Sequence, residues 1–370
     1  MTPHDRARYI MIGGFLGAGK TTAISRLARR LADQGKRVGV ITNDQGTELV
    51  DTALLRSKGF SVEEITGGCF CCRFNSLQEA AENLALEVRP DVFLAEPVGS
   101  CTDLVATVSY PLRRIYGDRF EIAPMSVLVD PVRAARILGL ESGRAFSEKV
   151  VYVYRKQLEE ADAIVVNKCD SIDAPLRDRL VSAIRDSFPK ASVFCASAKE
   201  GTGLEPWFES VLGPVAGDSR SLDLDYDAYA EGEALLGWLN ATARLTSAEP
   251  FDANQLLLRL TRDLRDRIAA QGIEIAHLKM TLDAEDGTGT LSVVSLVRSD
   301  AEPDLRESLL DRVEGGALVL NLRAEADPEI LKDAVEKALG ALGVAATIEH
   351  LERFRPARPV PLHRMKGGGA

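Results

Sequence analysis

The chain has 370 residues, a length that predicts about two domains rather than one. Its formal net charge of −10 argues against a general nucleic-acid binder, which is usually basic, and it contains no apolar run long enough to span a bilayer. Residues 1–6 lack the apolar core of a signal peptide. We therefore expect a cytoplasmic protein without a nucleic-acid or membrane partner.

The first motif is a glycine-rich loop between a predicted strand and a predicted helix. Residues 9–12 form a short apolar run, and apolar residues at helical spacing follow over 22–32. Between them, residues 14–21 match G-x-x-x-x-G-K-[ST], the phosphate-binding P-loop, rather than a chance glycine-rich turn. We expect this loop to bind a nucleotide through Gly14, Gly17, Ala18, Gly19, Lys20, Thr21 and Thr22.

Two side chains of this loop have defined chemistry. Lys20 can reach the β- and γ-phosphates, and the Thr21 hydroxyl can ligate Mg²⁺. The second predicted strand, residues 38–41, leads to Asp44, at the end of a parallel strand where α/β sheets bind ligands. Asp44 is thus a candidate switch residue near Mg²⁺ or a metal cargo. The alternative is an N-cap for a helix that starts near Thr47.

Three cysteines follow Gly67-Gly68 within four residues. Once deprotonated, Cys69, Cys71 and Cys72 can converge on one soft cation. The short spacing makes it hard for all three sulfurs to bind one ion with good coordination angles. A site with two of these sulfurs and ligands from elsewhere in the chain is equally plausible. The alternative is that they are small buried apolar residues.

A predicted helix over 74–87 precedes a third strand, residues 91–95, which ends in Glu96. A carboxylate at this position can hold Mg²⁺ directly or through water. The N–H group of Gly99 would then face the γ-phosphate. The alternative for Glu96 is a solvated strand end.

Later strands, at residues 126–130, 161–166 and 191–195, carry a base-recognition signal. Asn167, Lys168 and Asp170 fit N-K-x-D. An Asp carboxylate accepts hydrogen bonds from N1–H and N2–H₂ of guanine, donors that adenine lacks, so the wrong base would leave the site unpaired. The Asn167 side chain can bind the base edge, the Lys168 stem can cover the ring, and the backbone at Ser197 and Ala198 has the shape of the loop that contacts guanine O6.

These elements predict an α/β fold: a P-loop NTPase with a mostly parallel sheet over residues 1–213, followed by a smaller C-terminal domain. Residues 214–221 are the expected linker. Residues 222–352 alternate strand-like and helical patterns and predict an α+β domain, with one antiparallel sheet and two helices on one face. Residues 353–370, rich in Arg and Pro, are expected to form a flexible basic tail.

Taken together, the motifs resemble the CobW-like metallochaperone GTPases, a class related to HypB, UreG and MeaB. The resemblance covers residues 8 to about 213, and its most specific part is the G-C-x-C-C element. The motifs that carry it are Gly14 to Thr21, Asn43-Asp44-x-Gly46, Gly68-Cys69-Phe70-Cys71-Cys72, Glu96-x-x-Gly99 and Asn167-Lys168-Cys169-Asp170. Two departures are the 4 histidines, where many members carry a histidine-rich stretch, and an unfamiliar C-terminal domain.

The resemblance implies a role for each matching position. Cys69, Cys71 and Cys72 become candidate ligands of Zn²⁺, Co²⁺ or Ni²⁺. Lys20, Thr21, Asp44 and Glu96 become the phosphate and Mg²⁺ set that hydrolyses GTP. Asn167 and Asp170 become the guanine readers. The implied partner is a client metalloprotein or cofactor-dependent enzyme, and a homodimer is left open.

The function expected from the sequence is a GTPase that carries a transition metal and delivers it in a nucleotide-dependent way. No arginine finger is identifiable, so we expect slow intrinsic turnover, as low as ~10⁻⁴ to 10⁻² s⁻¹ for such switches. One alternative is a GTPase that gates the loading of a corrinoid cofactor onto a cobalamin-dependent enzyme. The other is a non-catalytic metal or redox sensor.

Overall fold

The computed structural model describes residues 6–46, 50–214 and 222–365, and the chain divides into two compact units. The first unit contains residues 1–45, 59–229 and 359–370, and the second contains residues 46–58 and 230–358. The domain predicted over residues 1–213 differs from the first unit in two places. Residues 46–58 belong to the second unit, and the first unit extends to residue 229. Residue 47, where a helix start is expected, and residues 215–221 of the expected linker lie outside the described residues.

The first unit is built on a sheet of eight strands, and each strand pairing within it is parallel. Its order is β3-β2-β4-β1-β6-β7-β8, and β5 pairs with β1. This confirms the predicted α/β class. The strands are β1 (Ala7–Gly14), β2 (Val38–Asn43), β3 (Ser61–Ile65), β4 (Val92–Glu96), β5 (Phe120–Ile122), β6 (Ser126–Val129), β7 (Ala163–Val166) and β8 (Ser192–Cys195).

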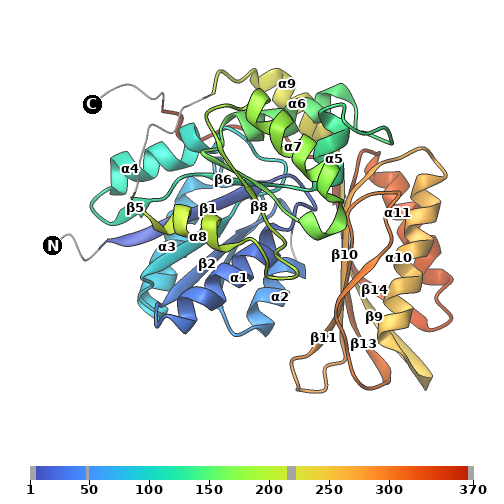
Figure 1. Cartoon of the computed structure of the whole chain (residues 1–370). Helices are drawn as coiled ribbons and strands as arrows, with labels where there is room; N and C mark the ends of the chain where they lie inside the picture. The colour runs from blue at the N-terminus through green and yellow to red at the C-terminus, as the bar shows by residue number, and fades with distance from the viewer. Residues whose placement is uncertain (1–5, 47–49, 215–221, 366–370) are drawn as a thin grey trace. The chain divides into compact units, whose positions relative to one another are not determined.

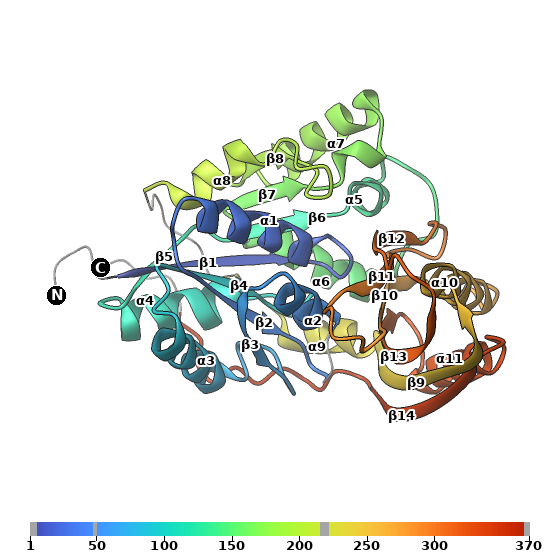
Figure 2. The same cartoon turned by 90° about the horizontal axis from the view of Figure 1, so that it is seen from below.

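Helices cover both faces of this sheet (Figure 2), which is why its central strands are almost wholly buried and apolar. No helix among the described residues is long and apolar enough to cross a membrane. The helices of this unit are α1 (Lys20–Asp33), α3 (Phe74–Glu87), α4 (Tyr110–Tyr116), α5 (Pro131–Ile137), α6 (Glu148–Glu159), α7 (Ala174–Ser187) and α8 (Glu205–Leu212), with a π-helix at Val105–Ser109 and a 3₁₀ turn at Cys169–Ser171. Helix α9 (Tyr226–Ala234) begins in the first unit and ends in the second.

The second unit is an antiparallel sheet of six strands in the order β12-β11-β10-β13-β9-β14. Helices α10 (Ala253–Ala269) and α11 (Pro328–Gly340) lie on the same side of it (Figure 1), as the alternation of apolar residues predicts. Asp252 and Asp327 cap these helices through their side chains. The strands are β9 (Gly237–Phe251), β10 (Ile275–Asp283), β11 (Leu291–Leu296), β12 (Asp304–Glu307), β13 (Val313–Ala324) and β14 (Ala345–Phe354).

Polar side chains on the other face of this sheet hold α2 (Val50–Ser57). The Val50 N–H group donates to Asn321 Oδ1 at 2.9 Å, and the Asn321 amide donates to Asn240 Oδ1 at 3.0 Å. Lys279 Nζ lies 2.6 Å from Asp51 Oδ1. The helix that follows the 43–46 loop in the chain is therefore part of the second unit.

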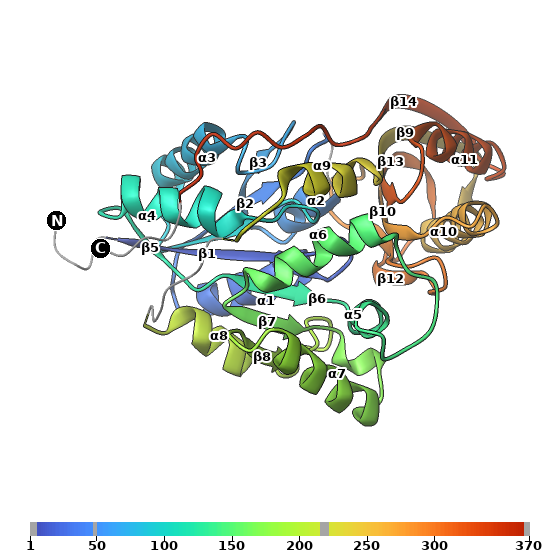
Figure 3. The same ribbon diagram turned by 90° about the horizontal axis from the view of Figure 1, so that it is seen from above.

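Beyond β14 the chain returns to the first unit. The Leu362 N–H group donates to the Cys71 carbonyl at 2.9 Å, and the Met365 N–H group donates to the Ala106 carbonyl at 2.9 Å. Figure 3 shows this segment running beside α3. Within the stretch 353–370, expected to be a flexible end, Phe354 closes β14 and residues 360–365 bind the first unit.

Candidate nucleotide and metal site

The P-loop connects β1 to α1 through glycines with positive φ. Gly14 has φ of 130°, and a Cβ there would lie 2.3 Å from the Leu128 carbonyl oxygen of β6. Gly19 has φ of 90°, and its Cβ would lie 2.5 Å from Asn167 Nδ2. Larger residues would be strained and would clash at both positions. The loop thus leads directly into α1, whose N-terminal N–H groups and dipole favour a phosphate.

Lys20, Thr21 and Glu96 come together at the carboxyl edge of the sheet. Strand β4 lies next to β1, with Met11 opposite Ala95, so Glu96 emerges beside the P-loop. The Thr21 hydroxyl donates to Glu96 Oε1 at 3.1 Å, and Lys20 Nζ lies 3.9 Å from the same oxygen. All three side chains are buried. A hydroxyl and a carboxylate are oxygen donors of the kind that Mg²⁺ prefers, so this pair fits the ion.

Gly99 lies directly against the P-loop. A Cβ on it would lie 3.1 Å from the Leu16 backbone nitrogen and 3.0 Å from Leu16 Cγ. The role expected for the Gly99 N–H group stays a prediction. Asp44 follows β2 and is half-buried, and its N–H group donates to the Ile65 carbonyl at 3.1 Å. Its place near Mg²⁺ stays a prediction.

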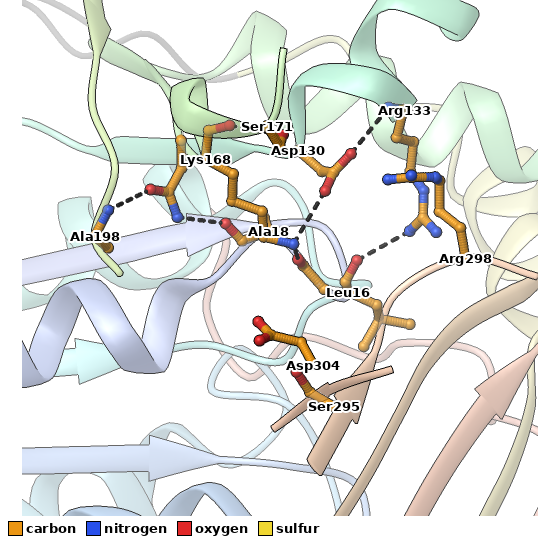
Figure 4. A network of polar contacts seen from close by, with 12 residues as sticks. Leu16, Ala18, Asp130, Arg133, Lys168, Ser171, Ala198, Ser295, Arg298 and Asp304 are labelled. Atoms are coloured by element: carbon orange, nitrogen blue, oxygen red, sulfur yellow. Dashed lines mark hydrogen bonds and ion pairs between the residues drawn. The ribbon is translucent and has the colours of Figure 1, made fainter. Parts of the chain in front are cut away.

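Two side chains of the N-K-x-D motif, those of Asn167 and Lys168, contact the P-loop. Figure 4 shows the Lys168 side chain reaching toward Asp130 and the backbone of the P-loop. Asn167 donates to the Ala18 carbonyl at 2.9 Å and accepts from the Ala198 N–H group at 2.9 Å. Lys168 Nζ donates to the Gly17 carbonyl at 2.7 Å and pairs with Asp130 Oδ2 at 3.0 Å. Asn167 and Lys168 therefore position two loops, a role in addition to the base contacts expected from the motif. Asp170 is exposed and Ser197 is buried.

Asp130 and Arg133 belong to this network, and the sequence analysis gave neither a role. Asp130 caps α5 by accepting from the Arg133 N–H group at 3.0 Å. The buried Arg133 guanidinium donates to the Leu16 carbonyl at 3.0 Å and lies over the rings of Phe15 and Phe146. The Asp-Pro pair at 130–131, typical of a helix start, was the available signal for the cap.

Cys69, Cys71 and Cys72 converge. Within the part of the chain that the structure describes, their three sulfurs form a group whose members all lie within 4.8 Å of one another. The sulfur separations are 2.6 Å for Cys69–Cys71, 3.4 Å for Cys69–Cys72 and 3.7 Å for Cys71–Cys72. In tetrahedral coordination with Zn–S bonds of about 2.3 Å, sulfurs lie about 3.8 Å apart. Two separations are near that value, and only the Cys69–Cys71 pair needs to open substantially.

The cysteine loop is held by Asn43, the last residue of β2. The Asn43 amide donates to the Gly68 carbonyl at 2.7 Å and to the Ile65 carbonyl at 3.0 Å. Its carbonyl oxygen accepts from the Phe70 N–H group at 2.8 Å. One buried side chain at the start of the 43–46 loop thus fixes the backbone on both sides of Cys69.

A fourth cysteine, which sequence reasoning missed, contacts this cluster. Cys101, five residues beyond Glu96, is 2% exposed, and its thiol is hydrogen-bonded to the Cys69 thiol. Hydrogen bonds from Cys101, Cys71 and Cys72 hold the pKa of Cys69 well below its usual range. The pKa of Cys71 is raised by its hydrogen bonds to Cys69 and Cys72 and by burial.

Glu160 and Asp103 support the loop that carries Cys101. Glu160 accepts from the Thr102 hydroxyl at 3.1 Å and from the Val105 N–H group at 3.2 Å. Its burial, opposed by the Val105 hydrogen bond and reinforced by the Asp103 charge, raises its pKa to about 8. Asp103 has φ of 63° and is bound by Tyr226 and Arg364, each at 2.7 Å.

The tail segment 360–365 covers the cluster from the side of Cys72, its most exposed member. The Val360 N–H group donates to Cys72 Sγ at 3.3 Å. The His363 ring packs edge-on against Phe74, with centroids 5.0 Å apart. Sequence reasoning could not find these contacts because the tail lies far from the cysteines in the chain.

The parallel sheet, the P-loop and the adjoining N-K-x-D motif define a P-loop nucleotide-binding domain, here with a thiol cluster beside it. Residues 8–194, just over half of the chain, match the model of the CobW/HypB/UreG nucleotide-binding domain. The chain belongs to the CobW/HypB/UreG family.

Relatives with this domain include proteins named for zinc. The zinc chaperone YeiR of Escherichia coli K12 is 34% identical over 164 residues, which are 43% of this chain and 46% of YeiR. The zinc chaperone CobW of a Sinorhizobium species is 33% identical over 186 residues, 44% of this chain and 51% of the relative. The chain thus spans about half the length of these curated relatives. HypB from Helicobacter pylori, solved in complex with nickel, matches 56% of this chain and 86% of its own with 21% identity and a TM-score of 0.41.

Proposed function

We propose that the protein is a GTP-hydrolysing metallochaperone that binds a transition metal through Cys69, Cys71 and Cys72 and delivers it to a client protein. The observation that carries the proposal is the Asn43 side chain, which joins the end of a nucleotide-facing strand to the backbone around Cys69. The names of the zinc-chaperone relatives support the choice of metal class. Zn²⁺, Co²⁺ and Ni²⁺ all suit thiolate ligands.

The P-loop residues perform the nucleotide part of this function. The α1 N-terminus and the loop N–H groups bind the phosphates, and Lys20 stabilises charge on the β- and γ-phosphates. Thr21 and Glu96 would hold Mg²⁺, which when bound neutralises charge on the phosphates. Asp170 reads the guanine edge, while Asn167 joins the P-loop to the 196–198 loop and Lys168 joins the P-loop to Asp130.

Coupling to the metal follows from the two loops that flank the γ-phosphate. The 43–46 loop begins at Asn43, and the 96–99 loop continues to Cys101, which contacts Cys69. A change in either loop on hydrolysis would alter the positions of the sulfurs and hence the metal affinity. The released ion then passes to ligands of the client.

The proposal is tested by titrating Co²⁺ into reduced protein with Mg²⁺–GTP, Mg²⁺–GDP or no nucleotide and recording absorbance. We expect thiolate-to-cobalt bands that appear at lower Co²⁺ with GTP than with GDP. Cys71→Ala should weaken these bands and abolish any metal stimulation of hydrolysis. If the protein shows no thiolate bands in any nucleotide state, the metallochaperone proposal is wrong.

A redox sensor is the second candidate, because the Cys69 and Cys71 sulfurs lie 2.6 Å apart. It predicts reversible loss of two thiols under mild oxidation and no effect of the metal on GTP turnover. Counting thiols before and after oxidation, in metal-free protein, separates the two functions.

A further inference from the structure

We propose that Cys101 is a fourth sulfur ligand of the transition metal, engaged when the loop after β4 binds a nucleoside triphosphate and withdrawn after hydrolysis. The inference rests on the proposed function and adds to it a ligand and a release step. The three clustered cysteines alone leave one position of a tetrahedral ion open. Cys101 is the nearby thiol on a separate loop that can fill it.

The contacts of Cys101 place it at the edge of the cluster. Its thiol is hydrogen-bonded to Cys69, yet it is not among the three sulfurs that all lie within 4.8 Å of one another. A small movement of its loop is therefore required to bring it to an ion at the centre. Cys101 is almost fully buried, so its thiol can reach only the neighbouring thiols and an ion that they bind.

The backbone links Cys101 to the P-loop. Gly99 packs against Leu16 of the P-loop so closely that a Cβ would contact the Leu16 backbone. The Gln157 amide of α6 donates to the Gly99 carbonyl at 3.0 Å and to the Cys101 carbonyl at 2.9 Å. The Cys101 N–H group donates to the Val98 carbonyl at 3.0 Å. Residues 98–101 are thus tied to one another and to α6, so the proposal requires that a nucleotide which shifts Gly99 shifts Cys101 with it.

The chemistry explains why such a ligand would be gated. Each thiol that ligates the ion loses its proton to solvent, and four thiolates give a closed site of the kind that holds zinc structurally. A carrier has to release its ion. Withdrawal of Cys101 leaves three thiolates and an open position, which a ligand from the client can occupy before the remaining bonds break.

The test counts sulfur ligands of bound zinc by X-ray absorption, with Mg²⁺ and either a non-hydrolysable GTP analogue or GDP. We expect four sulfurs with the analogue and three with GDP in the unaltered chain, and three in both states for Cys101→Ser. Competition with a zinc indicator should show affinities that differ about tenfold or more between the two nucleotides in the unaltered chain and that converge in Cys101→Ser.

Cys195→Ala is the matched control, because it removes a half-buried thiol outside the cluster and should behave like the unaltered chain. Binding of a fluorescent GDP analogue checks that each variant is folded. If the unaltered chain shows a nucleotide-dependent affinity that Cys101→Ser retains with the same sulfur count, the Cys101 proposal alone is wrong. Four sulfurs in both nucleotide states would overturn the gating. If the affinity for zinc does not depend on the nucleotide even in the unaltered chain, the coupling in the proposed function is wrong as well.

Discussion

The two sheets of the protein use buried polar side chains in different ways. In the parallel sheet, the central strands β4, β6 and β7 are mostly apolar, and the buried polar residues Asn43, Glu96 and Asn167 lie at or just beyond the carboxyl ends of their strands, where they contact loops or the start of α1. In the antiparallel sheet, Asn240 and Asn321 lie within the strands and bind each other, and Asn321 also binds α2. Asn43 and Asn167 thus connect loops at the edge of the parallel sheet, whereas Asn240 and Asn321 connect two strands and a helix within the second unit.

The largest effect expected from this comparison is on hydrolysis. Lys20→Ala removes the cation that stabilises the transferring phosphate, and we expect GTP turnover to fall about a hundredfold or more, as for the loss of one transition-state donor. Lys279→Ala removes the cation that pairs with Asp51 in the second unit and should leave turnover near the wild-type rate. Release of phosphate from saturating GTP measures both. Equal losses of GTP turnover in the two variants would contradict this difference between the units.

The apolar core of the second unit should dominate its stability. Leu320 is 1% exposed, and Leu320→Ala should lower the free energy of unfolding by about 2–5 kcal/mol. Leu310 is 98% exposed, so Leu310→Ala should change the free energy of unfolding by less than about 0.5 kcal/mol. Urea denaturation monitored by circular dichroism measures the difference, and similar stabilities of the two variants would show that the core is wrongly placed.

Glu160 should make stability fall as the pH rises. Its pKa is raised from 4.5 to about 8, so between these values the folded state holds a proton that the unfolded state has lost. The free energy of unfolding then decreases by at most about 1.4 kcal/mol per pH unit and levels off above the folded-state pKa. Glu160→Gln should flatten this slope in denaturation curves recorded from pH 6 to 9. If the slope is unchanged in Glu160→Gln, other titrating groups cause the dependence of stability on pH.

Asn43→Ala should uncouple the nucleotide from the metal. The variant loses the hydrogen bonds to Gly68 and Phe70, and we expect the affinity for Co²⁺ to fall about tenfold and to depend less on the nucleotide. Asn75→Ala, on the exposed face of α3, is the control. Retention of the full nucleotide effect in Asn43→Ala would show that the coupling runs through the 96–101 loop alone.

The smallest effect is expected from the tail. A chain that ends at Arg358 loses the Val360 contact with Cys72, and zinc transfer to a chelator should become faster by a few-fold, while equilibrium affinity changes little. A chain that ends at Met365 keeps these contacts and should transfer zinc at the original rate. Stopped-flow mixing with a chromophoric chelator compares the two, and equal rates would mean that the tail does not limit access.

The sequence predicts the local elements well because their causes are local. The P-loop glycines, the burial of β1, β2, β4, β6 and β7, and the Asp252 and Asp327 caps all follow from neighbouring residues. Contacts between loops depend on strand order, which one sequence does not provide. Asn43 meets Phe70 because β2 pairs with β3, and Cys101 meets Cys69 because β4 lies on the other side of β2.

The second unit was harder to predict for a related reason. Strand β9 carries small inward residues, Ala241 and Ala243, which give a weak alternation. The assignment of α2 to this unit depends on Asn321 and Lys279, which lie far away in the sequence. The tail contacts with Cys71 and Cys72 have the same origin, since no local pattern in residues 353–370 indicates a partner.

The path of the chain also limits how the protein can be divided. The backbone crosses between the units at 45/46, 58/59, 229/230 and 358/359, so the second unit is not an appendage joined by one linker. A chain cut back to residue 213 would keep α2 but lose the sheet on which Val50 and Leu55 are buried. We therefore expect that the second unit cannot be removed or exchanged without exposing the apolar face of α2 that carries Val50 and Leu55.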